Sequence, residues 1–512
     1  MLRRATAAVI MLAFMVQLAG CYKNSTAYVS TSTAQNGKDN RFIGVTTHDA
    51  EYVRFDAPAV INAGRVIGRV HGAPYEIDVD DVQYFWVKRR EVDGTKTAIA
   101  VLGAALGAVV IAGSLGGGSD PPQRTTTTQA ESCPFVYSWD GSQWVFDAEP
   151  YGGAVSRGLE RDDYTELEHL RPDDGLYRLM VRNELEETQH TNLAELWVAD
   201  HSPDISLASD VFGKLYTLRD PQPPISATNG QGHDLLPWLR ADDKLIWEPQ
   251  PVAGADPSMR EEVVLTFAKP PGAKRVKLIT RAATAFWGSH MILEMLELRG
   301  SRLDQWYADV DNGMAESMAL YQWNLREELY ALKVSVEEPD GWAVRGMIPG
   351  GGPFITEKRV VVLDVSRVAG DEIRIRLRPP IGFWALNAFA LDASPDEAIH
   401  MTKLAPKEAH DADGNDLRSV LTQLDDAYHV MPEIGDVAYL TFDVPAAAPS
   451  MKRTVFLHTS GWYRVHVDAS GTPNVAGLEQ IFDVPGGAAR LAAERYAEWL
   501  AASSSSVGSE WQ

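Results

Sequence analysis

From residue 134 to residue 465 the chain repeats short runs of alternating apolar and polar residues, separated by glycine, proline and aspartate. The clearest example is PFVYSWDGSQWVFDAEP (134–150), in which two alternating aromatic runs flank Asp140-Gly141. An Asp-Gly pair between such runs is a strong signal for a β-hairpin. We therefore expect a hairpin here, with a ladder of large rings on one face.

The same pattern continues through stretches such as VVLTFAKPPGAKRVKLIT (263–280). Short strands joined by tight turns favour antiparallel sheets over a parallel α/β sheet. The sequence therefore predicts a mainly β protein with two or three antiparallel β-sandwich units of jelly-roll-like form. We place these units at 133–305, 306–400 and 401–485.

Three other segments have their own patterns. Residues 41–96 contain closely spaced strand signals of a length typical of a small β-barrel-like domain. The stretch 302–332 is the main helical candidate in the middle of the chain, within the second sandwich unit. Residues 486–512 begin with an amphipathic helix, which we expect to lie on the last sheet, and end in a frayed tail.

The N-terminus reads MLRRATAAVIMLAFMVQLAGC, with two arginines before a short apolar run. This arrangement is typical of a secretory signal peptide. The run Leu18-Ala19-Gly20-Cys21 resembles the bacterial lipobox, in which a signal peptidase cuts before a cysteine that carries a diacylglycerol. The resemblance implies a signal peptide at 1–20 and lipidation of Cys21. The alternative is an ordinary signal peptide followed by a chance cysteine.

A lipidated cysteine anchors a protein because membrane affinity rises with each buried methylene group. Residue 22 is tyrosine and not the aspartate that retains such proteins in the inner membrane, so the resemblance implies the outer membrane, facing either the periplasm or the cell surface. Residues 21–40 are polar and rich in Ser, Thr and Asn, which predicts a flexible tether.

The segment 97–118 contains AIAVLGAALGAVVIAGSLGGG, an uncharged run rich in alanine and glycine. It resembles the glycine-zipper stretches of several outer-membrane lipoproteins, and the spacing of its glycines places them on one helix face. These helix-packing or membrane residues are Gly103, Gly107, Gly113 and Gly117. Membrane insertion, self-association and packing on a neighbouring domain stay open. Residues 119–132 have the composition of a linker.

Composition narrows the class of protein. The formal charge of −23 argues against a protein that binds nucleic acid through a basic surface. With only two cysteines, the chain has neither a disulfide framework nor a thiolate-rich metal site. If Cys21 is lipidated, Cys133 lacks a partner within the chain, and its fate stays open.

We find no nucleophile elbow, zinc-protease motif, phosphate loop or dinucleotide fingerprint in the sequence, and we predict no cofactor and no metal. His458 and His466 lie an even number of residues apart but lack a third ligand. The run DADGND (411–416) resembles the start of a calcium loop, yet its sixth position is Asp416 and its twelfth is Thr422, so we interpret it as a turn.

Two tryptophans bear on sugar binding. GFWALNAFA (382–390) resembles the last core strand of galactose-binding-like jelly rolls, and Trp384 in it is expected in the core. Trp462 follows a Ser-Gly pair, which predicts an exposed position after a turn, and it is our candidate ligand-binding residue.

We therefore expect a non-catalytic, lipid-anchored cell-envelope protein with a scaffolding or binding role. The alternative is a carbohydrate-binding surface lipoprotein that uses loop aromatics, and a hydrolase with an unrecognised site is a third reading.

A repeated Asp-x-Ser-Pro-Asp at 200–204 and 392–396, each after a strand signal, suggests two related β units.

Overall fold

The computed structural model of the chain describes residues 22–30, 42–47, 52–62, 64–70, 73–92, 134–249, 259–446 and 450–496. These residues divide into two compact units. The N-terminal unit holds the described strands between residues 22 and 92, and the main unit holds the described residues between 134 and 494 apart from 142–144.

Several predicted features lie outside the described residues. They are the signal peptide 1–20, Cys21, the segment 97–118 with its four glycines, the linker 119–132, Cys133 and the tail after residue 496. Among the helices in the described part of the chain, none combines the length and the apolar character that crossing a membrane requires.

The N-terminal unit is one sheet with the strand order β1-β6-β2-β3-β4-β5. Its strands are β1 (Tyr22–Ser30), β2 (Phe42–Thr47), β3 (Tyr52–Asn62), β4 (Arg65–Val70), β5 (Ala73–Asp78) and β6 (Val82–Val92). A core of apolar side chains holds them together, including Phe42 and Phe85, whose ring centroids lie 4.6 Å apart. Strands β1 and β5 lie at opposite ends of the order, so the described strands form an open sheet and no closed barrel.

The first half of the predicted tether is a strand. Strand β1 pairs antiparallel with β6, from Tyr22 opposite Val92 to Ser30 opposite Tyr84. The expectation of a flexible tether throughout 21–40 is therefore wrong for residues 22–30. Threonine, tyrosine and valine favour extended backbone, and the neighbouring strand supplies the hydrogen-bond partners that the composition of this segment alone does not reveal.

The main unit contains two pairs of sheets. The first sheet pair consists of a sheet in the order β23-β25-β10-β7-β8 and a sheet in the order β22-β11-β26-β9, in which β24 also pairs with β11. Its strands are β7 (Phe135–Trp139), β8 (Trp144–Ala148), β9 (Arg161–Glu166), β10 (Leu176–Arg182), β11 (Glu187–His201), β22 (His400–Leu404), β23 (Glu408–Asp411), β24 (His429–Met431), β25 (Val437–Asp443) and β26 (Lys452–Val465). Both sheets contribute to one core, for example Leu179 from the first and Leu196 from the second.

The second sheet pair lies in the chain between β11 and β22. Its sheets have the orders β13-β12-β19-β16-β21 and β14-β15-β20-β17-β18. Its strands are β12 (Ser206–Ser209), β13 (Leu215–Leu218), β14 (Ser226–Asn229), β15 (Val263–Ala268), β16 (Arg275–Thr284), β17 (Ala331–Glu338), β18 (Gly341–Pro349), β19 (Glu357–Asp364), β20 (Glu372–Leu377) and β21 (Trp384–Asp392). The strand pairs are antiparallel, except that β12 and β19 run parallel where they meet.

The mainly β prediction is therefore confirmed, but the sheets do not follow the expected boundaries at residues 305 and 400. Strands β22 to β26 complete the two sheets that β7 to β11 begin, so the segment 401–485 is not a separate β unit. The predicted hairpin is confirmed: β7 and β8 are neighbours, and the ring of Phe146 lies 5.1 Å from that of Phe135 and 5.7 Å from that of Tyr137.

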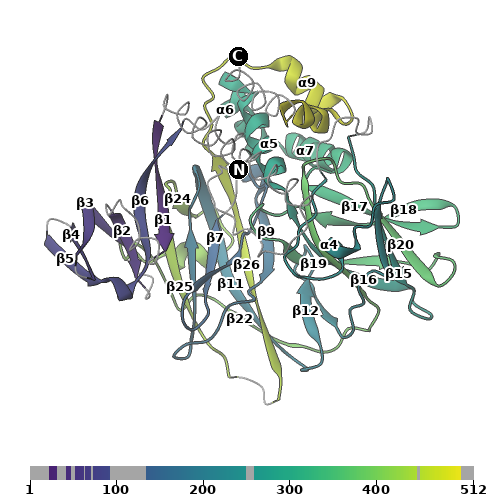
Figure 1. Ribbon diagram of the computed structural model, residues 1–512, viewed down its shortest axis with the longest axis horizontal. Helices are drawn as coiled ribbons and strands as arrows, with labels where there is room; N and C mark the ends of the chain where they lie inside the picture. The colour runs from purple at the N-terminus through teal and green to yellow at the C-terminus, as the bar shows by residue number, and fades with distance from the viewer. Residues whose placement is uncertain are drawn as a thin grey trace, which may run out of the picture. The chain divides into compact units, whose positions relative to one another are not determined.

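Helices gather at one end of the main unit (Figure 1). They are α5 (Phe286–Glu297), α6 (Leu303–Asn312), α7 (Met314–Glu327) and α9 (Val475–Asp483), while α4 (Leu236–Leu239) and α8 (Arg418–Leu421) are single turns. The helical candidate 302–332 is confirmed as α6 and α7. Helix α5 was not predicted, because residues 287–292 are all buried and show no amphipathic period.

The C-terminal helical region packs on another helix. The ring centroid of Phe482 in α9 lies 4.7 Å from that of Trp323 in α7. The indole nitrogen of Trp323 also donates to the carbonyl of Ile481 at 3.0 Å. The backbone is helical again from residue 487 to 496, and the amide of Gly486 just before it donates to Glu327 of α7 at 2.7 Å. The expected helix in 486–512 is thus confirmed for residues 487–496, and the residue just before it lies beside α7.

Candidate functional site

Trp462, the candidate ligand-binding residue, is 7% exposed and lies inside strand β26. Its indole stacks on the His190 imidazole, with ring centroids 3.7 Å apart and planes 5° apart. The expectation of an exposed Trp462 after a turn is wrong. Ser460-Gly461 forms part of a β-bulge opposite Thr191 and Leu193, and the strand continues through it. A sugar-binding role finds no exposed platform at this residue.

The other singled-out residues have structural surroundings. Trp384 is fully buried as expected, and its indole donates to the carbonyl of Glu328 at 2.8 Å. His458 lies 2.9 Å from Asp162 and 3.3 Å from Glu195, whereas the partner of His466 is the hydroxyl of Thr188 at 2.8 Å. The two histidines thus serve separate contacts. In 411–416, Asp411 accepts the amides of Asp413 and Asn415 at 3.0 and 2.9 Å, which confirms the turn.

The repeated Asp-x-Ser-Pro-Asp motif marks two equivalent strand ends. Asp200 at the end of β11 lies directly opposite Arg453 of β26 and accepts two hydrogen bonds from its guanidinium, at 2.6 and 2.8 Å. Asp392 at the end of β21 lies directly opposite Lys277 of β16, with 3.3 Å between the charged atoms. Each motif therefore begins with a buried aspartate paired with a cation of the neighbouring antiparallel strand.

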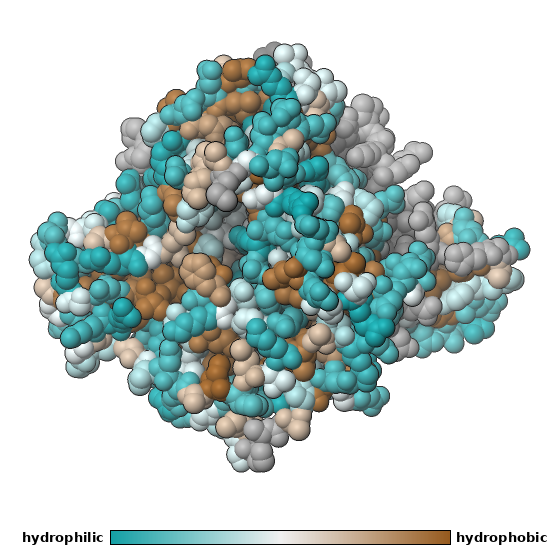
Figure 2. Space-filling model, turned by 180° about the vertical axis from the view of Figure 1, so that it is seen from behind, coloured by the Kyte–Doolittle hydropathy of each residue, from teal (hydrophilic) through white to brown (hydrophobic). Residues whose placement is uncertain are grey.

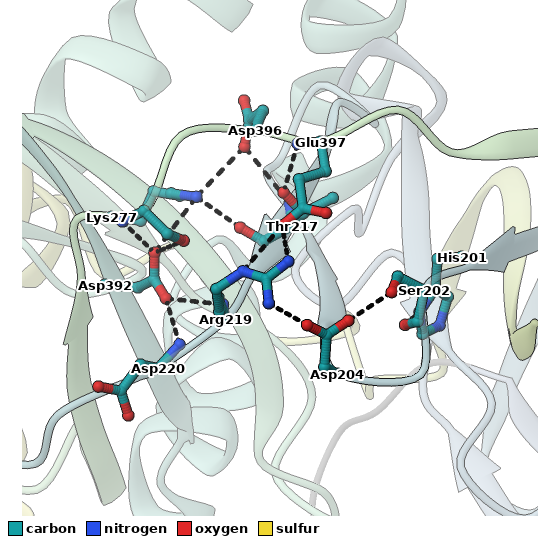
Figure 3. A network of polar contacts seen from close by, with 11 residues as sticks. His201, Ser202, Asp204, Thr217, Arg219, Asp220, Lys277, Asp392, Asp396 and Glu397 are labelled. Atoms are coloured by element: carbon teal, nitrogen blue, oxygen red, sulfur yellow. Dashed lines mark hydrogen bonds and ion pairs between the residues drawn. The ribbon is translucent and has the colours of Figure 1, made fainter.

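The two motifs meet in one polar network (Figure 3). The guanidinium of Arg219, which follows β13, contacts both Asp204 in the first motif and Glu397 just after the second, with its Nε at 2.9 Å from Glu397. Asp396 accepts from Lys277 at 3.2 Å. These contacts tie the end of the first sheet pair to the second, so we interpret the network as a structural connection.

A second set of charges is more deeply buried and lies where the two sheet pairs meet. We call it the junction cluster: Glu149, Asp163, Glu357 and Arg359. Their exposed fractions are 0, 5, 6 and 4%. Glu149 and Asp163 belong to the first sheet pair, and Glu357 and Arg359 come from the start of β19 in the second.

Arg359 connects Asp163 and Glu357 in the junction cluster. Its Nη2 donates to Glu357 at 2.8 Å and also contacts Asp163, while its Nη1 donates to the carbonyl of Tyr164 at 2.7 Å. Arg161 adds a second cation 3.5 Å from Asp163. One guanidinium thus satisfies acceptors from both sheet pairs.

Asp163 stays ionised in this buried position. Burial by itself favours the neutral acid, but Arg359, Arg161 and two backbone amides outweigh it and hold the pKa of Asp163 below its ordinary value. One of these amides, that of Tyr151, donates to Asp163 at 3.0 Å. Opposite charge and hydrogen bonds to the charged form both favour a carboxylate.

The other two acids respond in the opposite direction. Burial raises the pKa of Glu357 to about 7, against the opposing effect of Arg359. Burial also raises the pKa of Glu149 well above its ordinary value, and the nearby Glu357 adds to this shift. Two buried carboxyl groups that carry raised pKa values are a feature shared with acid–base sites, and this makes the junction cluster the candidate functional site.

Glycines allow the backbone to pack directly on the junction cluster. A Cβ at Gly152 would lie 2.6 Å from backbone atoms of Gly351 and Gly352, and a Cβ at Gly352 would lie 1.9 Å from the carboxyl group of Glu149. The cavity beside them is lined by glycines 152, 153 and 350–352 with Thr284, Ser289 and Tyr463 among its other residues, and has room for about one water molecule. The site is closed and is built for tight packing.

Gly152→Ala tests this packing. We expect it to lower the free energy of unfolding by about 1–3 kcal/mol, because the new methyl group meets backbone atoms that cannot rotate away. Gly471→Ala is the control, because a Cβ there meets nothing within 4 Å. Chemical denaturation of both variants gives the comparison. Equal stability of the two variants would contradict the close approach of the two glycine segments.

No sequence pattern predicted the junction cluster. Its only local signals are the two glycine runs, at 152–153 and 350–352, each close to a glutamate. Glu149 and Glu357 are far apart in the chain, so no spacing rule connects them. On the face shown in Figure 2, hydrophilic residues cover most of the surface and hydrophobic residues occur in small groups, which fits the net charge of −23.

Comparisons with known proteins place the chain in no family. No family model and no curated protein matches it. One solved structure, described as "The Triple Jelly Roll Fold and Turret Assembly in an Archaeal Virus", aligns at 8% identity over 68% of this chain and 99% of that chain, with a TM-score of 0.11. A similarity at this level carries no argument about fold or function.

Proposed function

We propose that the protein is a non-catalytic, lipid-anchored protein of the bacterial cell envelope with a scaffolding or binding role. The observation that carries the proposal is Leu18-Ala19-Gly20-Cys21 at the end of a charged and then apolar N-terminal run. Lipid on Cys21 attaches the chain to a membrane, which we take to be the outer membrane. Residues 97–118 are then available for self-association or for a second membrane contact.

The junction cluster supports a structural role for the main unit. Its carboxyl groups are 0 to 6% exposed, and the cavity that the neighbouring glycines line accommodates about one water molecule and is not lined by these carboxyl groups. Chemistry on a substrate requires a reacting atom within hydrogen-bond reach of the acid or base, and carboxyl groups buried to this extent are closed to one. The charged groups instead join the two sheet pairs, each of which we infer to be a β-sandwich, within one compact unit.

Cys21→Ser tests the anchor. We expect wild-type protein to incorporate a labelled fatty acid and to fractionate with outer membranes, and the variant to lose the label and move to the soluble fraction. Cys133→Ser is the matched control and should keep both the label and the membrane location. A wild-type protein without the fatty-acid label would overturn the proposed anchor, even if the protein stays in the membrane fraction through other segments.

A further inference from the structure

Glu149 differs from the other buried acids in what its two carboxyl oxygens contact. Its Oε2 accepts the backbone amide of Phe354 at 2.9 Å, and the amide of Ile355 also acts to lower the pKa of the carboxyl group, although burial outweighs both amides. Its Oε1 is buried, and no group among the described residues donates a hydrogen bond to it. The residue is fully buried, so this oxygen is also shielded from solvent.

The charged groups around Glu149 do not favour its ionised form. The cations of the junction, Arg359 and Arg161, contact Asp163, and Arg359 also binds Glu357. The group that faces Glu149 from β19 is Glu357, a second carboxyl. The segment 350–352 covers the Glu149 side chain so closely that only glycine fits at residue 352. A carboxylate in such a place pays a large desolvation cost without an ion pair to offset it.

We propose that Glu149 is a proton-binding site of the closed junction: it keeps a proton while the segment 350–355 is packed on it and releases the proton when the segment opens. Opening exposes the carboxyl group to water, where it ionises at its ordinary pKa. Rising pH therefore favours opening, and the joint between the two sheet pairs loosens as pH rises. The inference rests on the contacts of Glu149 and is independent of the proposed membrane anchor.

The direction follows from proton counting. Glu149 has a raised pKa in the closed state and an ordinary one in the open state, so the closed state binds more protons between these two values. The stability of the closed state is then complete below the ordinary glutamate pKa and declines as pH rises toward the raised one. One linked proton corresponds to roughly a tenfold change in the opening equilibrium per pH unit.

Hydrogen exchange of the full-length protein measures this linkage. After correction for the intrinsic pH dependence of exchange, we expect protection of the amides in 350–355 to fall as pH rises above the ordinary glutamate pKa, with a slope that reaches about tenfold per pH unit. Glu149→Gln is neutral at every pH and keeps the shape of the side chain. The slope of protection against pH in this variant should therefore be smaller than in the wild type by about tenfold per pH unit. An unchanged slope in Glu149→Gln would overturn the proposal.

Infrared spectroscopy reports the proton directly. At neutral pH the wild type should show the carbonyl band of buried protonated carboxylic acid. Glu149→Gln should lose the part of this band that belongs to Glu149, while a weaker band from Glu357, whose pKa is about 7, remains. Glu338→Gln is the matched control, because Glu338 is also buried but is paired with Arg345 and Arg367, and the band should persist in it. If Glu149→Gln does not fold, Glu357→Gln decides: it keeps Glu149, so loss of the entire band in that variant would overturn the assignment.

Discussion

Replacing Arg359 by methionine is expected to destabilise the protein by about 3–5 kcal/mol. The guanidinium is 4% exposed and holds both Asp163 and Glu357, so its removal leaves two buried carboxyl groups with much less positive charge beside them. Breaking one side of a buried ion pair is costly because the remaining charge stays desolvated. Methionine keeps much of the apolar volume, so the loss measures mainly the charge. Chemical denaturation monitored by circular dichroism gives the value.

Arg374→Met serves as the control for this experiment. Arg374 also lies on a strand and binds Glu337 at 2.6 Å, but both side chains are about two-fifths exposed, so we expect a change within about 1 kcal/mol. A further variant combines Arg359→Met with Asp163→Asn. It removes one of the two buried carboxylates that lose their cation in Arg359→Met, and it should recover part of the stability. An Arg359→Met protein as stable as Arg374→Met would show that the junction cluster does not hold the sheet pairs together.

Trp462→Ala is expected to cost about 3–5 kcal/mol of stability. The indole is 7% exposed and packs in a core with Tyr463, Tyr307 and the stacked His190 ring, so alanine leaves a cavity among large side chains. A second readout is the His190 titration. Burial, together with repulsion by Arg464, lowers the pKa of His190 to about 4. Water that enters beside the ring should raise this pKa, and NMR of the imidazole measures it.

Trp238→Ala removes the same side chain from an exposed position and is the control. Trp238 is 39% exposed in the short helix α4, so we expect a loss of less than about 1.5 kcal/mol. If Trp462→Ala keeps wild-type stability and instead loses binding to immobilised glycans, the indole is a binding platform after all, and the buried placement is contradicted.

Local sequence patterns predicted those parts of the fold that depend on neighbours in the chain. The hairpin around Asp140-Gly141 and helices α6 and α7 follow from alternation, turn chemistry and helical period. Helix α5 was not predicted, because burial on all sides removes the amphipathic period from its sequence. Strand β1 was not predicted either. Its partner β6 lies about sixty residues further along the chain, and the polar composition of the segment alone indicates a tether.

The two tryptophans show that local sequence is also a limited guide to whether a single residue is buried. Trp384 was predicted to be in the core because apolar neighbours surround it in the sequence. Trp462 was misjudged because Ser460-Gly461 is as compatible with a β-bulge as with a turn. The pairing of β26 with β11, more than 250 residues away in the chain, decides between the two.

The sequence by itself determined the β-rich class of the protein, its hairpins and its main helical region. It also carries the lipobox resemblance on which the proposed cellular location depends. These depend on residues that are close together in the chain, where backbone preference and side-chain period act directly. Only the tertiary structure decided that strands 400–465 complete the sheets begun at 135–201, that the two Asp-x-Ser-Pro-Asp motifs meet, and that Glu149, Asp163, Glu357 and Arg359 form one buried cluster. Strand pairing and charge burial join residues that are distant in the chain, and the ionisation of a carboxyl group depends on which cations and amides the fold places beside it.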